Sequence, residues 1–129
     1  MYSKINVADA PDRTRTDEEP AVRTLGYEIR ERGDSRPEKM RFNYFFYNEG
    51  DAVRRHKQHE QEELFFVVSG HATMEVGGEE FEIETGDVIV VDPGPWRQIR
   101  AHEETEIFAV GAPNLPDDVL FEDELDDDE

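Results

Sequence analysis

The sequence predicts an all-β domain, because it combines a two-residue apolar period, closely spaced glycine turns and the lack of a convincing helical stripe between residues 21 and 112. Apolar residues at every second position indicate strands with one buried face. Many short strands joined by tight turns are typical of a β-sandwich or a closed barrel. The 129 residues fit one domain with one hydrophobic core.

The first part of the predicted sheet consists of alternating segments. Leu25, Tyr27 and Ile29 occupy every second position, and the segment 40–47 alternates in the same way. Alternate residues of a strand share one face. We therefore expect strands in both places, and we expect a set of large side chains to fill the barrel: Phe42, Tyr44, Phe46, Phe65, Val67 and Met74.

The second part of the sheet carries turn signals between its strands. Apolar strand patterns follow one another at 64–68, 72–76, 81–83, 88–91 and 107–110. Gly77-Gly78 predicts a two-residue hairpin turn, because a type I′ turn needs positive φ at both central positions. Gly86-Asp87 marks the next turn.

The two ends of the chain differ from its middle. Residues 1–20 are polar with two prolines and predict an irregular N-terminal arm. Residues 113–129 form an acidic tail whose composition favours disorder, with Leu120, Phe121 and Leu125 as candidates for weak docking. These limits leave residues 21–112 as the β-barrel domain.

The charge of the chain is strongly acidic. Its 33 acidic residues against 14 basic ones give a net charge of −19, and only three of the basic residues are lysine. The charge fits either a cationic partner or a carboxylate shell suited to a high-salt cytoplasm, and the scarcity of lysine favours the second, halophilic interpretation. No basic stripe is present to displace phosphate counterions, so we expect no nucleic-acid partner.

The sequence also carries expectations about location and chemistry. No apolar stretch is long enough to span a membrane, and the first residues lack the pattern of a secretory signal, so we expect a cytoplasmic protein without membrane contact. Because the chain has no cysteine, thiolate metal sites and cysteine nucleophiles are excluded.

The most informative pattern consists of Gly50, His56, His59, Glu63 and Gly70. It resembles the first signature of the cupin family. In that signature five residues separate a glycine from two histidines that are one residue apart, three or four residues then precede a glutamate, and six more precede a second glycine. The spacing from the first glycine to the first histidine and from the glutamate to the second glycine agrees with the signature. Between the two histidines, two residues stand where the family has one.

A second segment resembles the second cupin signature. Gly86 and Gly94 hold the positions of its two glycines, and Asp92 stands where the family has a proline. Arg97 stands where the family has its third metal-binding histidine. Together the two segments and their surroundings extend the resemblance over about residues 40 to 112.

The resemblance implies a double-stranded β-helix, the jelly-roll barrel. Typical cupins hold one divalent metal inside the barrel with three histidines and a glutamate. They include oxygenases, isomerases, epimerases, lyases and non-enzymatic binders, so the family narrows the fold far more than the function. By the same resemblance we expect a homodimer.

The candidate metal ligands are His56, His59 and Glu63. In an extended strand His59 and Glu63 point to one face, and their ligand atoms suit Fe, Mn, Ni or Zn. His56 points to the other face unless a β-bulge re-aims it. Arg97 has no lone pair for a metal, and His102 replaces it only if the following strand is shifted.

Two functions remain open at this stage. The first is a cupin with a divalent metal in the barrel, acting as a metal-dependent enzyme on a small organic acid or sugar, with Arg97 binding the substrate's anionic group. The second is a metal-free module that binds or senses a small anionic ligand, with Arg97 paired to Glu63 inside the barrel. An outward Arg97 among surface acids is a third arrangement, and the lack of a ligand-sized pocket would favour a purely structural role. The sequence assigns no catalytic residue.

Overall fold

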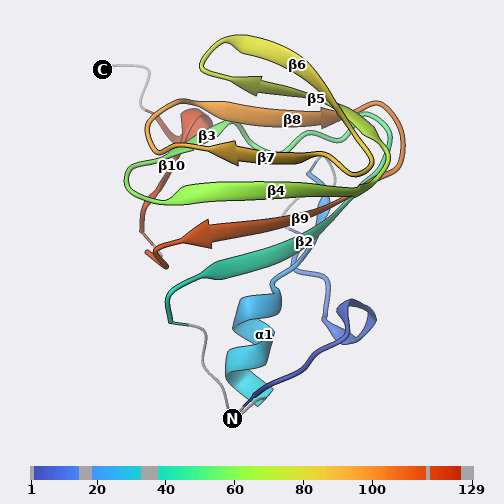
Figure 1. Ribbon diagram of the computed structural model, residues 1–129, viewed down its shortest axis with the longest axis vertical. Helices are drawn as coiled ribbons and strands as arrows, with labels where there is room; N and C mark the ends of the chain where they lie inside the picture. Colours follow the sequence, from blue (N-terminus) through green and yellow to red (C-terminus); the bar gives the residue numbers. More distant parts are fainter. Residues whose placement is uncertain (1, 15–18, 33–37, 116, 126–129) are drawn as a thin grey trace.

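The computed structural model describes residues 2–14, 19–32, 38–115 and 117–125, and its main body is a pair of five-stranded antiparallel sheets (Figure 1). The first sheet contains, in spatial order, β1 (Ala21–Arg23), β2 (Arg41–Tyr47), β9 (Thr105–Ala112), β4 (Glu62–Ser69) and β7 (Val88–Val91). The second contains β10 (Val119–Phe121), β3 (His56–Gln58), β8 (Arg97–Ala101), β5 (His71–Val76) and β6 (Glu79–Glu84).

Most neighbouring strands come from distant parts of the chain, as in a jelly roll. β2 pairs with β9, and β3 pairs with β8, both in antiparallel register. The prediction of an all-β fold of the double-stranded β-helix type is therefore confirmed. The strands form two sheets rather than one fully closed barrel.

The hydrophobic core lies between the two sheets. Val67 and Met74 are completely buried, as predicted, and Phe65 is 6% exposed. Residues of the other strands complete the core: Tyr47, Ala72, Ile83, Val91, Ile99, Ala101, Ile107 and Ala109. Each large apolar side chain buried in this way stabilises the fold by about 1.5–3 kcal/mol.

The prediction that Phe42, Tyr44 and Phe46 fill the barrel is wrong. β2 places Phe45 and Tyr47 against the core, so the alternate positions face outward. Tyr44 accordingly contacts the ring of Phe108 at 6.4 Å on the outer surface of the first sheet. Because β2 carries aromatic residues in both phases, alternation alone could not identify its inner face.

The prediction of a strand around Leu25, Tyr27 and Ile29 is also wrong. This segment is the helix α1 (Leu25–Arg32), which packs beside β2 (Figure 1). Leu25 and Glu28 are both 6% exposed, whereas Tyr27 is 52% exposed. Residues three and four apart share a helix face, so the segment buries one side of a helix. Within the described residues, no helix has the length and apolar character needed to span a bilayer.

The predicted hairpin at Gly77-Gly78 is confirmed. The two glycines have φ values of +59° and +89° and join β5 to β6, whose register begins at Val76 and Glu79. A different glycine is required for close packing: a Cβ on Gly70 would lie 2.4 Å from Oγ1 of Thr105. The β5–β6 turn therefore needs glycine for its positive φ values, and the β4–β5 connection needs it because Gly70 has no room for a Cβ.

Both ends of the chain contribute described structure. At the N-terminal end, the short 3-10 helix η1 (Val7–Asp9) precedes irregular chain, and residues 15–18 of the predicted arm lie outside the described residues. At the C-terminal end, β10 pairs with β3, and the 3-10 turn η2 (Glu122–Glu124) follows. The disorder expected for the tail is contradicted for 117–125, because β10 extends the second sheet beyond the predicted boundary at residue 112.

Candidate functional site

A cavity of about 580 Å³ lies between the sheets, which is within the usual size range of small-molecule pockets. Residues from β2, β4 and β9 line it on one side, and residues from β3, β8 and β10 line it on the other. Phe45, Tyr47 and Phe65 supply aromatic surface. A cavity of this size does not support the purely structural role.

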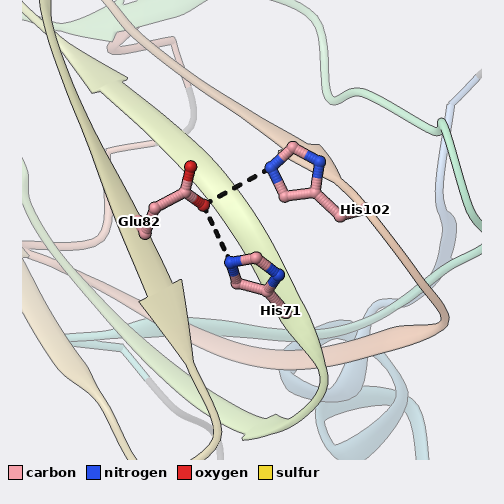
Figure 2. Close-up of side chains that lie close together, drawn as sticks. All are labelled: His71, Glu82 and His102. Atoms are coloured by element: carbon pink, nitrogen blue, oxygen red, sulfur yellow. Dashed lines mark ion pairs between the residues drawn. The ribbon is translucent and has the colours of Figure 1, made fainter.

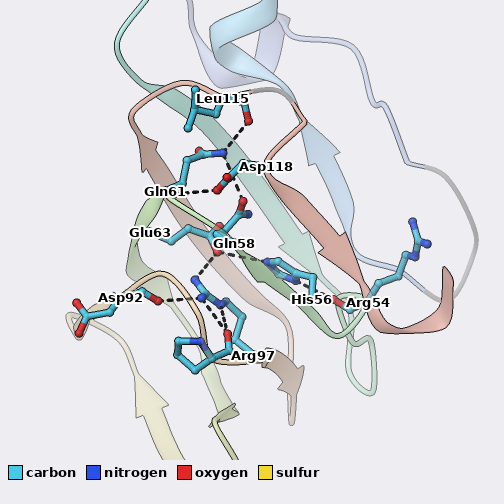
Figure 3. Close-up of polar contacts among 10 residues, drawn as sticks. Arg54, His56, Gln58, Gln61, Glu63, Asp92, Arg97, Leu115 and Asp118 are labelled. Carbon is cyan, nitrogen blue, oxygen red and sulfur yellow. Dashed lines mark hydrogen bonds and ion pairs between the residues drawn. The ribbon is translucent and has the colours of Figure 1, made fainter. Parts of the chain in front are cut away.

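Arg97 belongs to the polar wall of this cavity, and only 1% of it is exposed. Its Nη1 donates a hydrogen bond of 2.9 Å to Oε1 of Glu63. Its Nη2 donates to the carbonyl oxygens of Asp92 and Pro95, both at 3.0 Å (Figure 3). Arg97 therefore points inward and is paired with Glu63, as in the metal-free alternative of the sequence analysis.

His56 lies on the other side of Glu63. Its Nε2 is 3.3 Å from Oε1 of Glu63, and its Nδ1 is 2.9 Å from the carbonyl oxygen of Arg54 (Figure 3). Both neighbours are acceptors, so the imidazolium form of His56 would satisfy both as a donor. The structure thus brings His56, Glu63 and Arg97 together in one buried group.

Glu63 is ionised at neutral pH in this arrangement. Burial raises its pKa, but the hydrogen bond and charge of His56 and the charge of Arg97 outweigh burial and hold the pKa of Glu63 below its ordinary value. The pKa of Arg97 is lowered by burial, against the opposing effect of Glu63, yet a guanidinium stays protonated at any physiological pH. The group therefore contains a buried ion pair.

His59 is not part of this group. It is exposed and lies in the connection between β3 and β4, where its backbone N–H donates to the carbonyl of Asp118 at 3.3 Å. The expectation that His59 and Glu63 share a face assumed one extended strand through both. β3 ends at Gln58 and β4 begins at Glu62, so the alternation does not continue from one to the other.

Gln58 takes the inward position that the sequence analysis gave to a histidine. It is 4% exposed, two residues after His56 on β3, and lines the cavity. Its Oε1 accepts a weak hydrogen bond of 3.4 Å from Gln61 (Figure 3). The signal was present in the sequence: His56 and Gln58 are separated by one residue, and four residues then precede Glu63, a spacing that the first cupin signature allows.

These residues do not fit the metal centre that the fold family implies. Among the positions that correspond to its ligands, only His56 and Glu63 carry groups that typically bind a transition metal. Gln58 supplies a neutral amide, and Arg97 places a cation 2.9 Å from the carboxylate oxygen that would bind the metal. His102 is exposed and does not replace the missing histidine.

Three polar side chains of β2 face the cavity beside this group: Arg41, Asn43 and Tyr47. They share one face of the strand, since even numbers of residues separate them. Within the described residues, none of the three side chains forms a hydrogen bond or an ion pair. Burial, followed by the charges of Glu63 and Asp51, raises the pKa of Tyr47, so its hydroxyl remains a donor.

The C-terminal segment closes one side of the cavity. Phe121 of β10 places its ring 6.0 Å from the ring of His56, and the guanidinium of Arg54 lies 3.8 Å from the centre of the Phe121 ring. Asp118 accepts a hydrogen bond of 2.8 Å from the backbone N–H of Gln61, which fixes this segment against the β3–β4 connection. The tail, for which the sequence predicted disorder with weak docking at most, therefore forms part of the site.

Comparison with known proteins agrees with this architecture. The model of the cupin domain matches residues 43–111, which is more than half of the chain. The chain belongs to the cupin family. No match was found among curated proteins.

Solved cupin structures share the fold at low sequence identity. An uncharacterized conserved protein from Klebsiella pneumoniae with a double-stranded β-helix domain has a TM-score of 0.72 and 15% identity, over 94% of this chain and 97% of its own. A variant of Streptomyces PAC13 with uridine has a TM-score of 0.72 and 15% identity, over 94% and 91%. A Pseudoaminobacter salicylatoxidans salicylate 1,2-dioxygenase variant in complex with gentisate has a TM-score of 0.56 and 21% identity, over 62% of this chain and 22% of its own. Cupins of this fold thus include enzymes and bind small molecules.

Proposed function

We propose that this cupin binds a small anionic organic molecule between its sheets, without a metal in the barrel. The observation that carries the proposal is the 2.9 Å hydrogen bond between buried Arg97 and Glu63. A buried carboxylate is costly unless a cation compensates it. Arg97 supplies that cation from the protein itself, so Glu63 needs no metal to remain ionised.

The anionic character of the ligand follows from the other arginine of the cavity. Arg97 already donates from Nε, Nη1 and Nη2 to Glu63, Asp92 and Pro95. Arg41 lines the same cavity and has no ion pair within the described residues. We therefore assign contact with the ligand's anionic group to Arg41, and we assign to Arg97 the role of holding Glu63 and the backbone carbonyls of Asp92 and Pro95.

The remaining walls suit a compact organic molecule. Asn43 and Tyr47 offer unpartnered polar groups within the described residues, and Phe45 and Phe65 offer flat apolar surface. Pockets of this kind combine apolar walls with a few polar groups that fix orientation. Support also comes from two structural neighbours, whose ligands, gentisate and uridine, are molecules of this size.

Calorimetry on chelator-treated protein tests the proposal. The full chain in EDTA would be titrated with small carboxylates and phosphates, gentisate among them, and with uridine as an uncharged probe. We expect an anionic probe to bind in EDTA, and Arg41→Gln to weaken that binding at least tenfold by removing a charge-assisted hydrogen bond.

The matched control for this experiment is Arg100→Gln, which changes an exposed arginine of β8. It should leave the affinity unchanged. If no anionic probe binds in EDTA, or if binding appears only after a divalent metal is added, the metal-dependent alternative replaces this proposal. Equal losses in both arginine variants would show a general charge effect and would remove Arg41 from the site.

We also propose that the outer face of the first sheet pairs two copies of the chain. Phe66, Val88 and Val90 are 37%, 58% and 58% exposed, and Phe66 lies directly opposite Val88 in the sheet. Clustered exposed apolar residues usually mark an interface. They support the expected homodimer, while the cytoplasmic location and the high-salt adaptation stay predictions.

A further inference from the structure

Two histidines and a glutamate meet on the outer surface of the second sheet, outside the cavity (Figure 2). His71 begins β5, Glu82 lies in β6, and His102 follows β8 in the turn to β9. Nε2 of His71 is 2.9 Å from Oε2 of Glu82, and Nε2 of His102 is 3.4 Å from the same oxygen. Two imidazoles thus approach one carboxylate oxygen.

The backbone holds both histidines in this arrangement. The backbone N–H of His102 donates to the carbonyl of His71 at 3.0 Å, so the turn is tied to the start of β5. The backbone N–H of His71 donates to Oγ1 of Thr105 at 3.2 Å. Glu82 stands diagonally across the β5–β6 hairpin from His71, at a separation that side chains on one face of a sheet bridge readily.

We propose that His71, Glu82 and His102 form a surface site for a divalent transition-metal cation such as Zn²⁺. One ligand atom from each of the three residues lies within 4.8 Å of the others. Zinc bonds to nitrogen and oxygen of about 2.0–2.2 Å in a tetrahedron require ligand atoms roughly 3.4 Å apart. The separations of 2.9 and 3.4 Å between the two imidazole nitrogens and Oε2 of Glu82 are close to that value, so small side-chain movements complete the site.

The donor set and the charge of the molecule agree with this assignment. Two imidazole nitrogens and one carboxylate oxygen are ligands that Zn²⁺ and Fe²⁺ bind with positions left open for water. The hydroxyl of Thr73 donates to Oε1 of Glu82 at 3.0 Å, which orients the carboxylate as the hydrogen-bond partners of ligating side chains do in metal sites. A net charge of −19 also raises the concentration of cations near the surface.

A bound cation would cross-link three parts of the second sheet. β5 and β6 form a hairpin at the edge of that sheet, and the turn with His102 belongs to the β8–β9 connection. The metal would join the hairpin to this connection and stabilise the folded state in proportion to its occupancy. The site is separate from the barrel, so it does not depend on the proposed function.

Zinc binding to the full chain tests the inference. The protein would be stripped with chelator, returned to a metal-free high-salt buffer without phosphate, and titrated with ZnCl₂ by calorimetry. We expect about one equivalent to bind, and we expect His71→Ala, His102→Ala and Glu82→Gln each to weaken binding at least tenfold. Zinc should also raise the melting temperature of the wild type and leave that of His71→Ala unchanged.

Two control variants locate any zinc that binds. Glu63→Gln repeats the chemistry of Glu82→Gln inside the barrel, and His59→Ala removes an exposed histidine elsewhere. Both should bind zinc as the wild type does. The inference is overturned if the wild type binds no zinc, if binding is lost in Glu63→Gln but kept in Glu82→Gln, or if weak binding persists in all variants, as a diffuse carboxylate shell would produce. Circular dichroism confirms that each variant is folded.

Discussion

The buried pair of Arg97 and Glu63 makes a quantitative prediction about stability. Arg97→Met would leave Glu63 in a site where only 14% of its side chain is exposed, and Glu63→Leu would leave the guanidinium with carbonyl partners alone. Breaking a buried pair from one side typically costs 3–5 kcal/mol. The double variant removes both charges, so its loss should be smaller than the sum of the two single losses by about 2–3 kcal/mol.

Urea unfolding measures the free energy of unfolding of the wild type, the two single variants and the double variant. With an m-value of about 2 kcal/mol/M, a loss of about 4 kcal/mol lowers the unfolding midpoint by roughly 2 M. The measurements belong in molar KCl, where the surface charges are screened. The coupling between Arg97 and Glu63 should change little between low and high salt, because a buried pair is screened far less than an exposed one.

The pH dependence of the same coupling has a defined sign. The pKa of Glu63 is lower in the folded state than its ordinary value, so its stabilising effect is fully present above the unfolded pKa of about 4.3. The effect is lost as the pH falls through the lower folded pKa. A coupling below about 0.5 kcal/mol at pH 7, or one that disappears in molar salt, would refute the buried pair and with it the metal-free site.

Three further predictions concern salt, packing and assembly. If the carboxylate shell is an adaptation to salt, the melting temperature should rise by several degrees from low to molar KCl, and a constant value would contradict it. Gly70→Ala should lower the free energy of unfolding in urea by about 3 kcal/mol or more, because its Cβ would meet backbone atoms at 2.6–2.7 Å. Gly78→Ala, whose Cβ would face open space, should lower it by about 1–2 kcal/mol for the positive φ alone. Sedimentation should show a dimer that Phe66→Ser with Val90→Ser weakens, and a monomeric wild type in molar salt would exclude it.

The strand pattern was predictable where one phase of the alternation is apolar. In β5, Ala72 and Met74 are buried and their neighbours are polar, so the period gives the inner face directly. In β2 both phases are aromatic, and the inner face is decided by packing against the opposite sheet. The helix α1 escaped prediction because Leu25 and Ile29 fit a spacing of four as well as a period of two.

The candidate site was predictable only in part. The family spacing singled out the positions of Glu63 and Arg97 but left open whether Arg97 points inward, and the alternation rule was carried through the β3–β4 connection and selected His59 in place of Gln58. The sequence marked Phe121 only as a candidate for weak docking, because acidic composition favours disorder and says nothing about pairing with β3. Long-range pairing of this kind is a tertiary effect.

Gln58 and Arg97 stand where the family has metal-binding histidines, and the two departures are physically linked. A metal centre that lacks its third histidine binds metal more weakly, and replacing its second histidine by the amide of Gln58 weakens it further. Without a metal, a buried Glu63 would become protonated unless another cation stood beside it. Arg97 is that cation. It follows that Arg97→His alone should not create a metal site, because Gln58 still offers a weak ligand and Glu63 has lost its partner. Gln58→His combined with Arg97→His restores three imidazoles and a carboxylate around one point, and metal analysis after Glu82→Gln removes the surface site should find metal only in this double variant. Metal in Arg97→His alone would show that Gln58 does not limit binding.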